Sequence, residues 1–264
     1  MADMKQLRTR IKSVDSTLHL TKAMGLVASS KIRRAGIAMN KSRDYLGAIN
    51  GIMADLTSSV ECQNSPFMQK RGERVRTVVI AGDRGLAGGY NANVFRLVKE
   101  QGFDDIIPIG KRAYDRFGGK FYSSEHFSAT DADDMARKLI ADYLAGEYDR
   151  LCIVSTEYVS MMTQTARVTS VLPLEKGDAA ASATIFEPDR ESILFAAVQE
   201  YVAGNIAHAV RESFASEVAA RRMAMDSAGK NAQTMIDELT IEYNTARQGA
   251  ITQEITEIVA GSGN

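Results

Sequence analysis

The sequence predicts an α/β protein that combines a long antiparallel coiled coil, formed by its N- and C-terminal helices, with a small Rossmann-like α/β domain whose sheet is mostly parallel. Three observations support this fold class. The four prolines all lie between residues 66 and 188, both flanking segments carry helical apolar repeats, and the middle alternates strand-like and helix-like runs. Proline costs a helix interior about 3 kcal/mol, so proline-free segments permit very long helices. We therefore divide the chain into residues 1–65, 66–188 and 189–264.

Length and composition place the chain among globular proteins. It has 264 residues, of which 45% are hydrophobic and 25% charged, and its net charge is -1, so no overall field draws it to nucleic acid. The basic cluster at Lys31, Arg33 and Arg34 lacks interleaved aromatic residues, which also argues against a nucleic-acid partner. Uncharged stretches such as Tyr45–Ala54 and Tyr201–Val210 are about half as long as a membrane-spanning helix. The N-terminus has no apolar signal core, so we expect a cytoplasmic protein.

The N-terminal segment carries an apolar residue at alternating steps of three and four from Met4 to Leu56. Of the 16 positions in this series, 13 are apolar, and the exceptions are Thr21, Gly25 and Ser42. A seven-residue repeat over this length indicates a left-handed supercoil against a second helix, because the apolar face of a straight helix would drift away from it. The pattern favours a coiled coil over one face of an ordinary helical bundle.

The C-terminal segment supplies the partner helix. Apolar residues recur every four positions from Leu194 and every seven positions from Val218. Residues 1–50 contain ten Lys or Arg and three Asp, a net charge of +7, whereas residues 189–264 contain six Lys or Arg and eleven Asp or Glu, a net charge of −5. Opposite charges favour pairing of the two helices over self-pairing of either one.

The middle segment alternates strands and helices. Four apolar runs bounded by glycine or polar residues are expected to be strands: Val75–Ala81, Ile106–Ile109, Leu151–Thr156 and Arg167–Leu174. Three segments with helical spacing lie among them: Asn91–Gln101, Lys111–Phe117 and Asp133–Leu144. Strands that are joined through helices favour right-handed crossovers and a largely parallel sheet.

The glycine-rich turn Gly82–Gly89 is where a nucleotide-binding enzyme would hold phosphate. The turn lacks the Gly-x-x-x-x-Gly-Lys-Ser/Thr spacing, since Tyr90 and Asn91 follow it, and it also lacks Gly-x-Gly-x-x-Gly. A tight strand-to-helix connection is the favoured interpretation. The three histidines and the two cysteines, Cys62 and Cys152, show no metal-ligand spacing. We expect no catalytic residue, no metal site and no cofactor.

Three segments are specific enough to indicate a family. They are IKSVDSTLHLTKAMGLVASSK at Ile11–Lys31, ESFASEVAARRMAMDSAGKNA with LTIEYNTARQGAITQEITEIV in Glu212–Val259, and GDRGLAGGYN after the first strand. Together they resemble the gamma subunit of bacterial F-type ATP synthases over most of the chain. The resemblance implies a non-catalytic rotor shaft. Such a shaft couples rotation of the membrane c ring to ATP synthesis or hydrolysis in the alpha/beta ring, and contributes to regulation of ATPase activity and proton flow.

The resemblance also implies partners and a location. The partners would be the alpha and beta subunits of the hexameric ring, the epsilon subunit and the membrane c ring, with no nucleic acid. The chain would meet the membrane only through the assembled complex. It would lie at the cytoplasmic face of the bacterial inner membrane as a peripheral component of hydrogen ion transport.

Several residues match positions at which the family contacts its partners. The rotor-to-beta contact matches Lys22, Met24 and Arg221, and the polar catch on the beta subunit matches Arg247, Gln248 and Thr252. The rim loop matches Arg84 and Ala87, and the foot on the c ring and epsilon matches Phe186 and Glu187. An apolar bearing inside the ring matches Ile251, Ile255, Ile258 and Val259.

These matches set an expected helix register. If Met24 lies near Arg221, the numbers of facing residues sum to about 245, and Leu7 faces Leu239. The last turns beyond Ile251 then have no partner in the N-terminal helix. The chain departs from the family at Ala87, where a cysteine is common, so thiol chemistry at that loop is not expected.

Two other interpretations stay open at this point. A small nucleotide-binding α/β enzyme with helical arms would bind nucleotide tightly and stoichiometrically as an isolated chain. A free-standing coiled-coil scaffold would form a stable homodimer. Purification of the native assembly would distinguish both from a rotor subunit.

Overall fold

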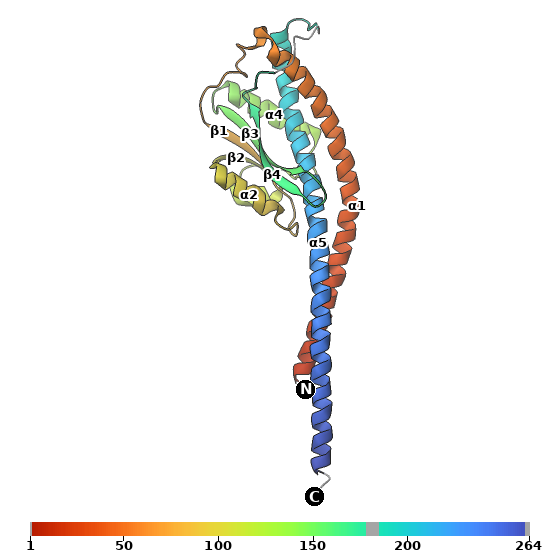
Figure 1. Cartoon of the computed structure of the whole chain (residues 1–264). Helices are drawn as coiled ribbons and strands as arrows, with labels where there is room; N and C mark the ends of the chain where they lie inside the picture. Colours follow the sequence, from red (N-terminus) through yellow and green to blue (C-terminus); the bar gives the residue numbers. More distant parts are fainter. Residues whose placement is uncertain (1, 178–184, 262–264) are drawn as a thin grey trace. The chain divides into compact units, whose positions relative to one another are not determined.

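The structure, a computed structural model, describes residues 2–177 and 185–261 (Figure 1). The chain divides into two compact units, Met1–Ser29 with Arg221–Asn264 and Ser30–Ala220. Helices α1 (Ala2–Ser58) and α5 (Arg190–Gly261) each contribute residues to both units. The sequence-based division at residues 65 and 188 stays a prediction, because these units cut across the two helices instead of following their ends.

Both terminal segments are long continuous helices, as their lack of proline predicts. All 16 positions of the α1 repeat from Met4 to Leu56 are buried or half-buried, including Thr21, Gly25 and Ser42. The carboxylate of Asp189 accepts hydrogen bonds from the Ser192 backbone N–H and hydroxyl, both at 2.8 Å, and so satisfies donors at the start of α5.

In the unit built from residues 1–29 and 221–264, α1 and α5 run antiparallel, but not in the expected register. A Cβ on Gly229 would lie 3.6 Å from Thr21 Oγ1 and 3.8 Å from Leu18 Cδ1, and one on Gly25 would lie 3.8 Å from Met225 Cβ. The residue numbers of these pairs sum to 247–250, two to five above the expected sum of about 245. Extrapolated along the helices, these sums place Leu239 nearer Ile11 than Leu7. The apolar repeat and the charges favour pairing of the helices, but neither sets their axial position.

The other unit contains one four-stranded sheet of order β2-β1-β3-β4. Strands β1 (Val75–Ile80), β2 (Asp105–Ile109) and β3 (Arg150–Tyr158) are parallel, and β4 (Gln164–Leu172) is antiparallel to β3. The mostly parallel sheet is therefore confirmed. Strand β4 begins three residues before its predicted start and ends at Leu172, because Pro173 has no N–H for the ladder.

Helices cover both faces of this sheet (Figure 1). On one face, Val78, Ile80 and Ile153 pack in the main core with residues of α4 (Ala129–Leu144), α5 and α1. On the other face, Val79 and Val154 pack with residues of α2 (Tyr90–Gln101) and α3 (Lys111–Phe117). Successive strand residues point to opposite faces, so continuous apolar runs are needed when both faces are covered.

Helix α4 begins four residues before its predicted start because of its cap. Ser128 Oγ accepts the Asp131 N–H at 3.0 Å, while Asp131 Oδ2 accepts the Ser128 N–H at 2.9 Å. The reciprocal pair satisfies two otherwise unpaired donors of the first turn. A short 3₁₀ turn, η1 (Val60–Cys62), follows α1.

Helix α5 also contains an 18-residue window with a mean hydropathy of 1.2 and low charge, the length and composition of a membrane span. Within this protein, 56% of that window is buried. Burial of this extent is expected of a core helix.

We predict that Gly110→Ala disrupts the sheet far more than Gly102→Ala. Gly110 has φ +94° and its Cβ would lie 1.9 Å from the Ala81 carbonyl oxygen, whereas Gly102 has φ +69° with open space around it. We expect Gly102→Ala to lower the free energy of unfolding by about 1–2 kcal/mol, and Gly110→Ala by more than about 4 kcal/mol. Urea unfolding of the full chain, followed by circular dichroism, measures both. Equal losses would contradict the close approach at Gly110.

Candidate functional site

The end of α5 is exposed from Ile251 to Gly261. Buried or half-buried positions continue along α5 in steps of three and four through Leu239, Tyr243, Ala246 and Ala250, and then stop. Beyond this point four large apolar side chains are 47–70% exposed: Ile251, Ile255, Ile258 and Val259. At about 100° per residue they lie roughly 80–180° around the helix from Ala250. The exposed apolar stripe is therefore a second face of α5 and does not continue the seam.

Arg247, Gln248 and Thr252 are all exposed next to this stripe. The same helical geometry puts Arg247 and Thr252 on its two sides and Gln248 within it. The Thr252 hydroxyl donates to the Gln248 carbonyl at 2.9 Å, so its oxygen is left to accept. Across the described residues, no hydrogen bond or ion pair engages the Arg247 guanidinium or the Gln248 amide. The structure thus brings these three residues together as donors and acceptors beside an apolar surface.

Lys22 is exposed, whereas Met24 and Arg221 are half-buried. Lys22 lies at a hollow of about 500 Å³ between the two helices of this unit. Gly25 and Gly229 line the hollow, because their missing side chains leave space between the helices. Leu26, which is 69% exposed, forms part of its edge. No sequence pattern singles out Leu26, although the glycines at seam positions are a usable signal for a hollow.

In the unit of residues 30–220, the glycine-rich turn after β1 is held by Asp83. Its carboxylate accepts the Lys111 N–H at 2.9 Å, the Ser123 hydroxyl at 2.7 Å, and the backbone N–H groups of Ser124 and Glu125. Burial alone would raise the pKa of this carboxyl, but these hydrogen bonds together lower its pKa below the ordinary value. The turn is therefore anchored from beneath by an ionised carboxylate.

The exposed part of this turn differs from the residues that the resemblance selected. The Arg84 side chain is 69% exposed and lies 3.6 Å from Glu125. Glu125 also pairs with Lys31, and that hydrogen bond lowers the pKa of its carboxyl. Ala87 is only 2% exposed, so its side chain faces inward, while Leu86, at φ +62°, is 64% exposed. Arg84 and Leu86 are the side chains that this turn presents.

Side chains of α5 fill the edge of the sheet where an α/β enzyme would bind its ligand, outside the carboxyl ends of the strands. The Glu217 carboxyl lies 2.6–3.0 Å from where a Cβ on Gly82 would be. Ser213 Oγ accepts the Thr156 N–H at 3.0 Å, and Gly82 donates its N–H to Asn91 Oδ1 at 2.9 Å. These two backbone N–H groups are thus engaged within the chain, which favours the interpretation of the turn as a connection.

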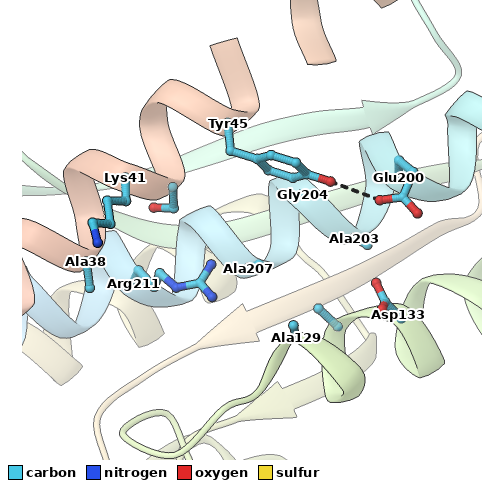
Figure 2. Close-up of a pocket in the computed structure, with 12 residues that line it drawn as sticks. Ala38, Lys41, Tyr45, Ala129, Asp133, Glu200, Ala203, Gly204, Ala207 and Arg211 are labelled. Atoms are coloured by element: carbon cyan, nitrogen blue, oxygen red, sulfur yellow. Dashed lines mark hydrogen bonds between the residues drawn. The ribbon is translucent and has the colours of Figure 1, made fainter. Parts of the chain in front are cut away.

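A hollow of about 430 Å³ opens in this unit among α1, α4 and α5 (Figure 2). Its lining includes six small residues: Ala38, Ala129, Ala132, Ala203, Gly204 and Ala207. The Tyr45 hydroxyl donates to Glu200 at 2.9 Å, and Ser42 donates to the Met39 carbonyl at 2.7 Å. Both hydroxyls therefore donate to acceptors within the chain.

A buried polar cluster lies beside this hollow. Ser42 Oγ is 3.0 Å from His208 Nδ1, and Glu212 accepts from Arg167 at 3.0 Å while lying 3.8 Å from His208. Burial, reinforced by the charges of Arg43, Arg167 and Arg211, lowers the pKa of His208 to about 4. Burial raises the pKa of Glu212. A neutral histidine therefore joins α1 to α5 in this core.

The segment at Phe186 and Glu187 is only partly available for contact. The Phe186 ring packs against the main core, and the Arg190 guanidinium lies 4.7 Å from its centroid. Glu187 is exposed, and Ile185 is 86% exposed. Within the described residues, Ile185 and Glu187 are thus the side chains that this segment presents.

Comparison with known proteins places these features in a family. The family described as ATP synthase matches residues 3–263. A relative named ATP synthase gamma chain in Ruminococcus albus is 40% identical over 283 residues, covering 100% of this chain and 99% of the relative. A relative of the same name in Moorella thermoacetica is 37% identical over 280 residues, covering 99% of both.

Solved structures share the fold. A chain in the Euglena gracilis mitochondrial ATP synthase OSCP/F1/c-ring assembly has a TM-score of 0.68 at 19% identity, covering 99% of this chain and 94% of that one. A chain of the rotor from the same organism has a TM-score of 0.65 at 18% identity, covering 95% of this chain and 99% of that one.

We predict that His208→Gln changes the response of stability to acid. The unfolded chain protonates this histidine below about pH 6.5, whereas the folded chain does so only near pH 4. Stability from the neutral imidazole is therefore complete above pH 6.5 and lost as the pH falls towards 4. Relative to the variant, the wild type should lose about 2–4 kcal/mol across this range. Urea unfolding at several pH values measures the difference; because Glu212 is present in both chains, parallel profiles would contradict the assignment.

Proposed function

Because the chain belongs to the family of ATP synthase gamma chains, we propose that it meets the alpha and beta subunits through the exposed end of α5. The chain is a non-catalytic rotor subunit of an F-type ATP synthase, a membrane-associated complex. We further propose epsilon and the c ring as its rotor partners. In the bacterial cell the proposed location is the cytoplasmic face of the inner membrane, reached only through the complex.

The observation that carries this proposal is the apolar stripe at the end of α5. Four large apolar side chains there are exposed and lie off the seam that pairs with α1. Burial of their exposed part would contribute about 4–7 kcal/mol before the entropy of ordering is subtracted. An apolar sleeve formed by the alpha and beta subunits could provide that burial. An apolar surface also suits a part that turns past several subunits, because it forms no directional bonds that must break at each step.

The polar residues beside the stripe provide the complementary property. We assign Arg247, Gln248 and Thr252 to a catch that favours particular rotor angles. Charge-assisted hydrogen bonds from Arg247 to carboxylates or carbonyls would each contribute about 1.5–3 kcal/mol. A rotor shifts the nucleotide states of its partners only if it contacts them differently at different angles. An apolar stripe that covers part of the helix, with a charged group at its edge, creates such a difference.

The other contacts are proposed for the side chains that are exposed. Lys22 and the neighbouring Leu26 form the proposed contact with the lower part of the beta subunits, near Met24 and Arg221. Arg84, together with Leu86, forms the proposed rim contact.

At the foot, Glu187 and Ile185 are the proposed contact residues towards the c ring and epsilon. Phe186 is assigned to positioning this segment, since its ring is packed against the core beneath Arg190.

We predict that Arg247→Ala lowers both ATP synthesis and hydrolysis in the assembled enzyme. Loss of one charge-assisted contact at the favoured angle corresponds to roughly a tenfold effect or more on the steps that use it. Folding should not change, because Arg247 is exposed. The matched control is Arg8→Ala, which removes an exposed arginine from α1. Normal turnover of the Arg247 variant at normal assembly would refute the catch.

We predict that replacement of Ile251, Ile255 and Ile258 by serine lowers the yield of complex more than the activity of each complex formed. The change removes apolar surface but leaves Arg247 and Gln248 in place. The control replaces the interleaved polar residues Gln253, Glu254 and Glu257 by serine. Native gels and ATPase activity per assembled complex measure the two quantities. A normal yield of complex with lost ATPase activity per complex would show that the stripe takes part in rotation-coupled catalysis, and would contradict its proposed role in assembly.

A further inference from the structure

Arg222 links α1 to α5 in the unit of residues 1–29 and 221–264. Its Nη1 donates to the Gly25 carbonyl oxygen at 3.0 Å and to Ser29 Oγ at 2.7 Å. Ser29 Oγ in turn donates to the same Gly25 carbonyl at 3.0 Å. The guanidinium is half-buried. One side chain of α5 is therefore bonded to two points on α1 that lie one turn apart.

The seam around Arg222 is small and apolar. Gly25 lies against Met225, and Ala28 and Ala232 are 3% and 5% exposed. A repeat of three and four residues presents an equivalent apolar row after each shift of seven positions, so apolar contact alone leaves several axial registers close in energy. Small side chains also interlock less than large ones. This part of the seam needs another interaction to select one register.

Hydrogen bonds to fixed atoms can make that selection. Sliding one helix by a single residue moves it by about 1.5 Å and rotates the residues at the contact by about 100°. Bonds of 2.7 and 3.0 Å would then lie beyond hydrogen-bonding distance. Only registers near the observed one allow Arg222 to reach the Gly25 carbonyl and Ser29 together.

We propose that Arg222 is a positioning residue that fixes the axial register of α1 against α5. Within this unit, Lys22 and Leu26 lie on α1, whereas Arg247 and Gln248 lie on α5. The axial distance between these two surfaces depends on the register, because a shift of seven residues moves one helix by about 10 Å along the other. For a rotor, that distance sets which parts of the partner subunits are contacted at the same time, and this consequence rests on the proposed contacts.

The test measures register by disulfide formation in the assembled complex. Ile11→Cys is paired in turn with Leu239→Cys, which lies opposite in the observed register, and with Ala232→Cys or Ala246→Cys, one heptad to either side. With Arg222 present, we expect the disulfide at 11–239. In Arg222→Met the yield at 11–239 should fall by about tenfold, the effect of losing a charge-assisted bond, with new disulfides at the flanking pairs.

Coupling is the second measurement. Protons pumped per ATP hydrolysed should fall in Arg222→Met, while hydrolysis per complex falls less. Lys12→Met removes an exposed cation from α1 and should change neither quantity. If Arg222→Met fails to assemble, the same disulfide and coupling measurements are made on Ser29→Ala. That variant removes one acceptor of Arg222 and leaves the Gly25 carbonyl in place. An unchanged 11–239 disulfide in the assembled variant would overturn the proposal. An altered disulfide pattern with a normal number of protons pumped per ATP hydrolysed would support Arg222 as the residue that sets the register. It would overturn the proposed consequence of that register for the rotor.

Discussion

The burial of one face of α5 is the constraint on which both units depend. In the unit of residues 30–220, five residues of this helix are at most 3% exposed: Leu194, Val198, Val202, Ile206 and Val210. Their burial contributes about 7–15 kcal/mol before the entropy of ordering is subtracted. The same helix supplies Ser213, Ser216 and Glu217 to the carboxyl edge of the sheet, where an α/β enzyme would bind its ligand. Packing of α5 thus both completes the core and occupies the usual ligand position.

Farther along α5 the pattern changes from contact with a sheet to contact with one helix. The change is visible in the sequence as a change of apolar spacing from four to seven after Phe214. In the unit of residues 1–29 and 221–264, the seam is narrow and rich in small residues, so most of the helix surface stays exposed. An element with a narrow buried seam can present different chemistry on its remaining sides. The α5 end does so, with an apolar stripe on one side and Arg247 at its edge.

Fold class was predictable because its determinants are periodic. Every position that the Met4–Leu56 repeat selects is buried or half-buried. This holds even for Gly25, although a glycine inside a helix lowers its stability. The start of α4 was missed although Ser128 and Asp131 form a recognisable capping pair. The expected helix register differs from the observed one by a few residues, because heptads repeat and charge is spread along the helices. It depends on contacts such as those of Arg222, which no spacing reveals.

Contact residues were predictable only in part. The exposed catch residues came from resemblance, and their position beside an apolar stripe is consistent with that role. Ala87 and Phe186 were selected by the same resemblance, but one is buried and the other packs against the core. Leu86 and Ile185, their exposed neighbours, carry no sequence signal, because exposure of an apolar side chain depends on the fold around it. The resemblance therefore selected segments that carry exposed side chains, but not in every case the exposed side chain itself.

The central claim is that this chain turns as one rotor within an F-type ATP synthase. Its most direct test attaches a visible probe to a cysteine introduced by Lys138→Cys, an exposed site on α4, in single complexes held by their alpha/beta ring. The account predicts that ATP drives stepwise rotation of the probe in one direction. ATP hydrolysis at the normal rate with a stationary probe would contradict it.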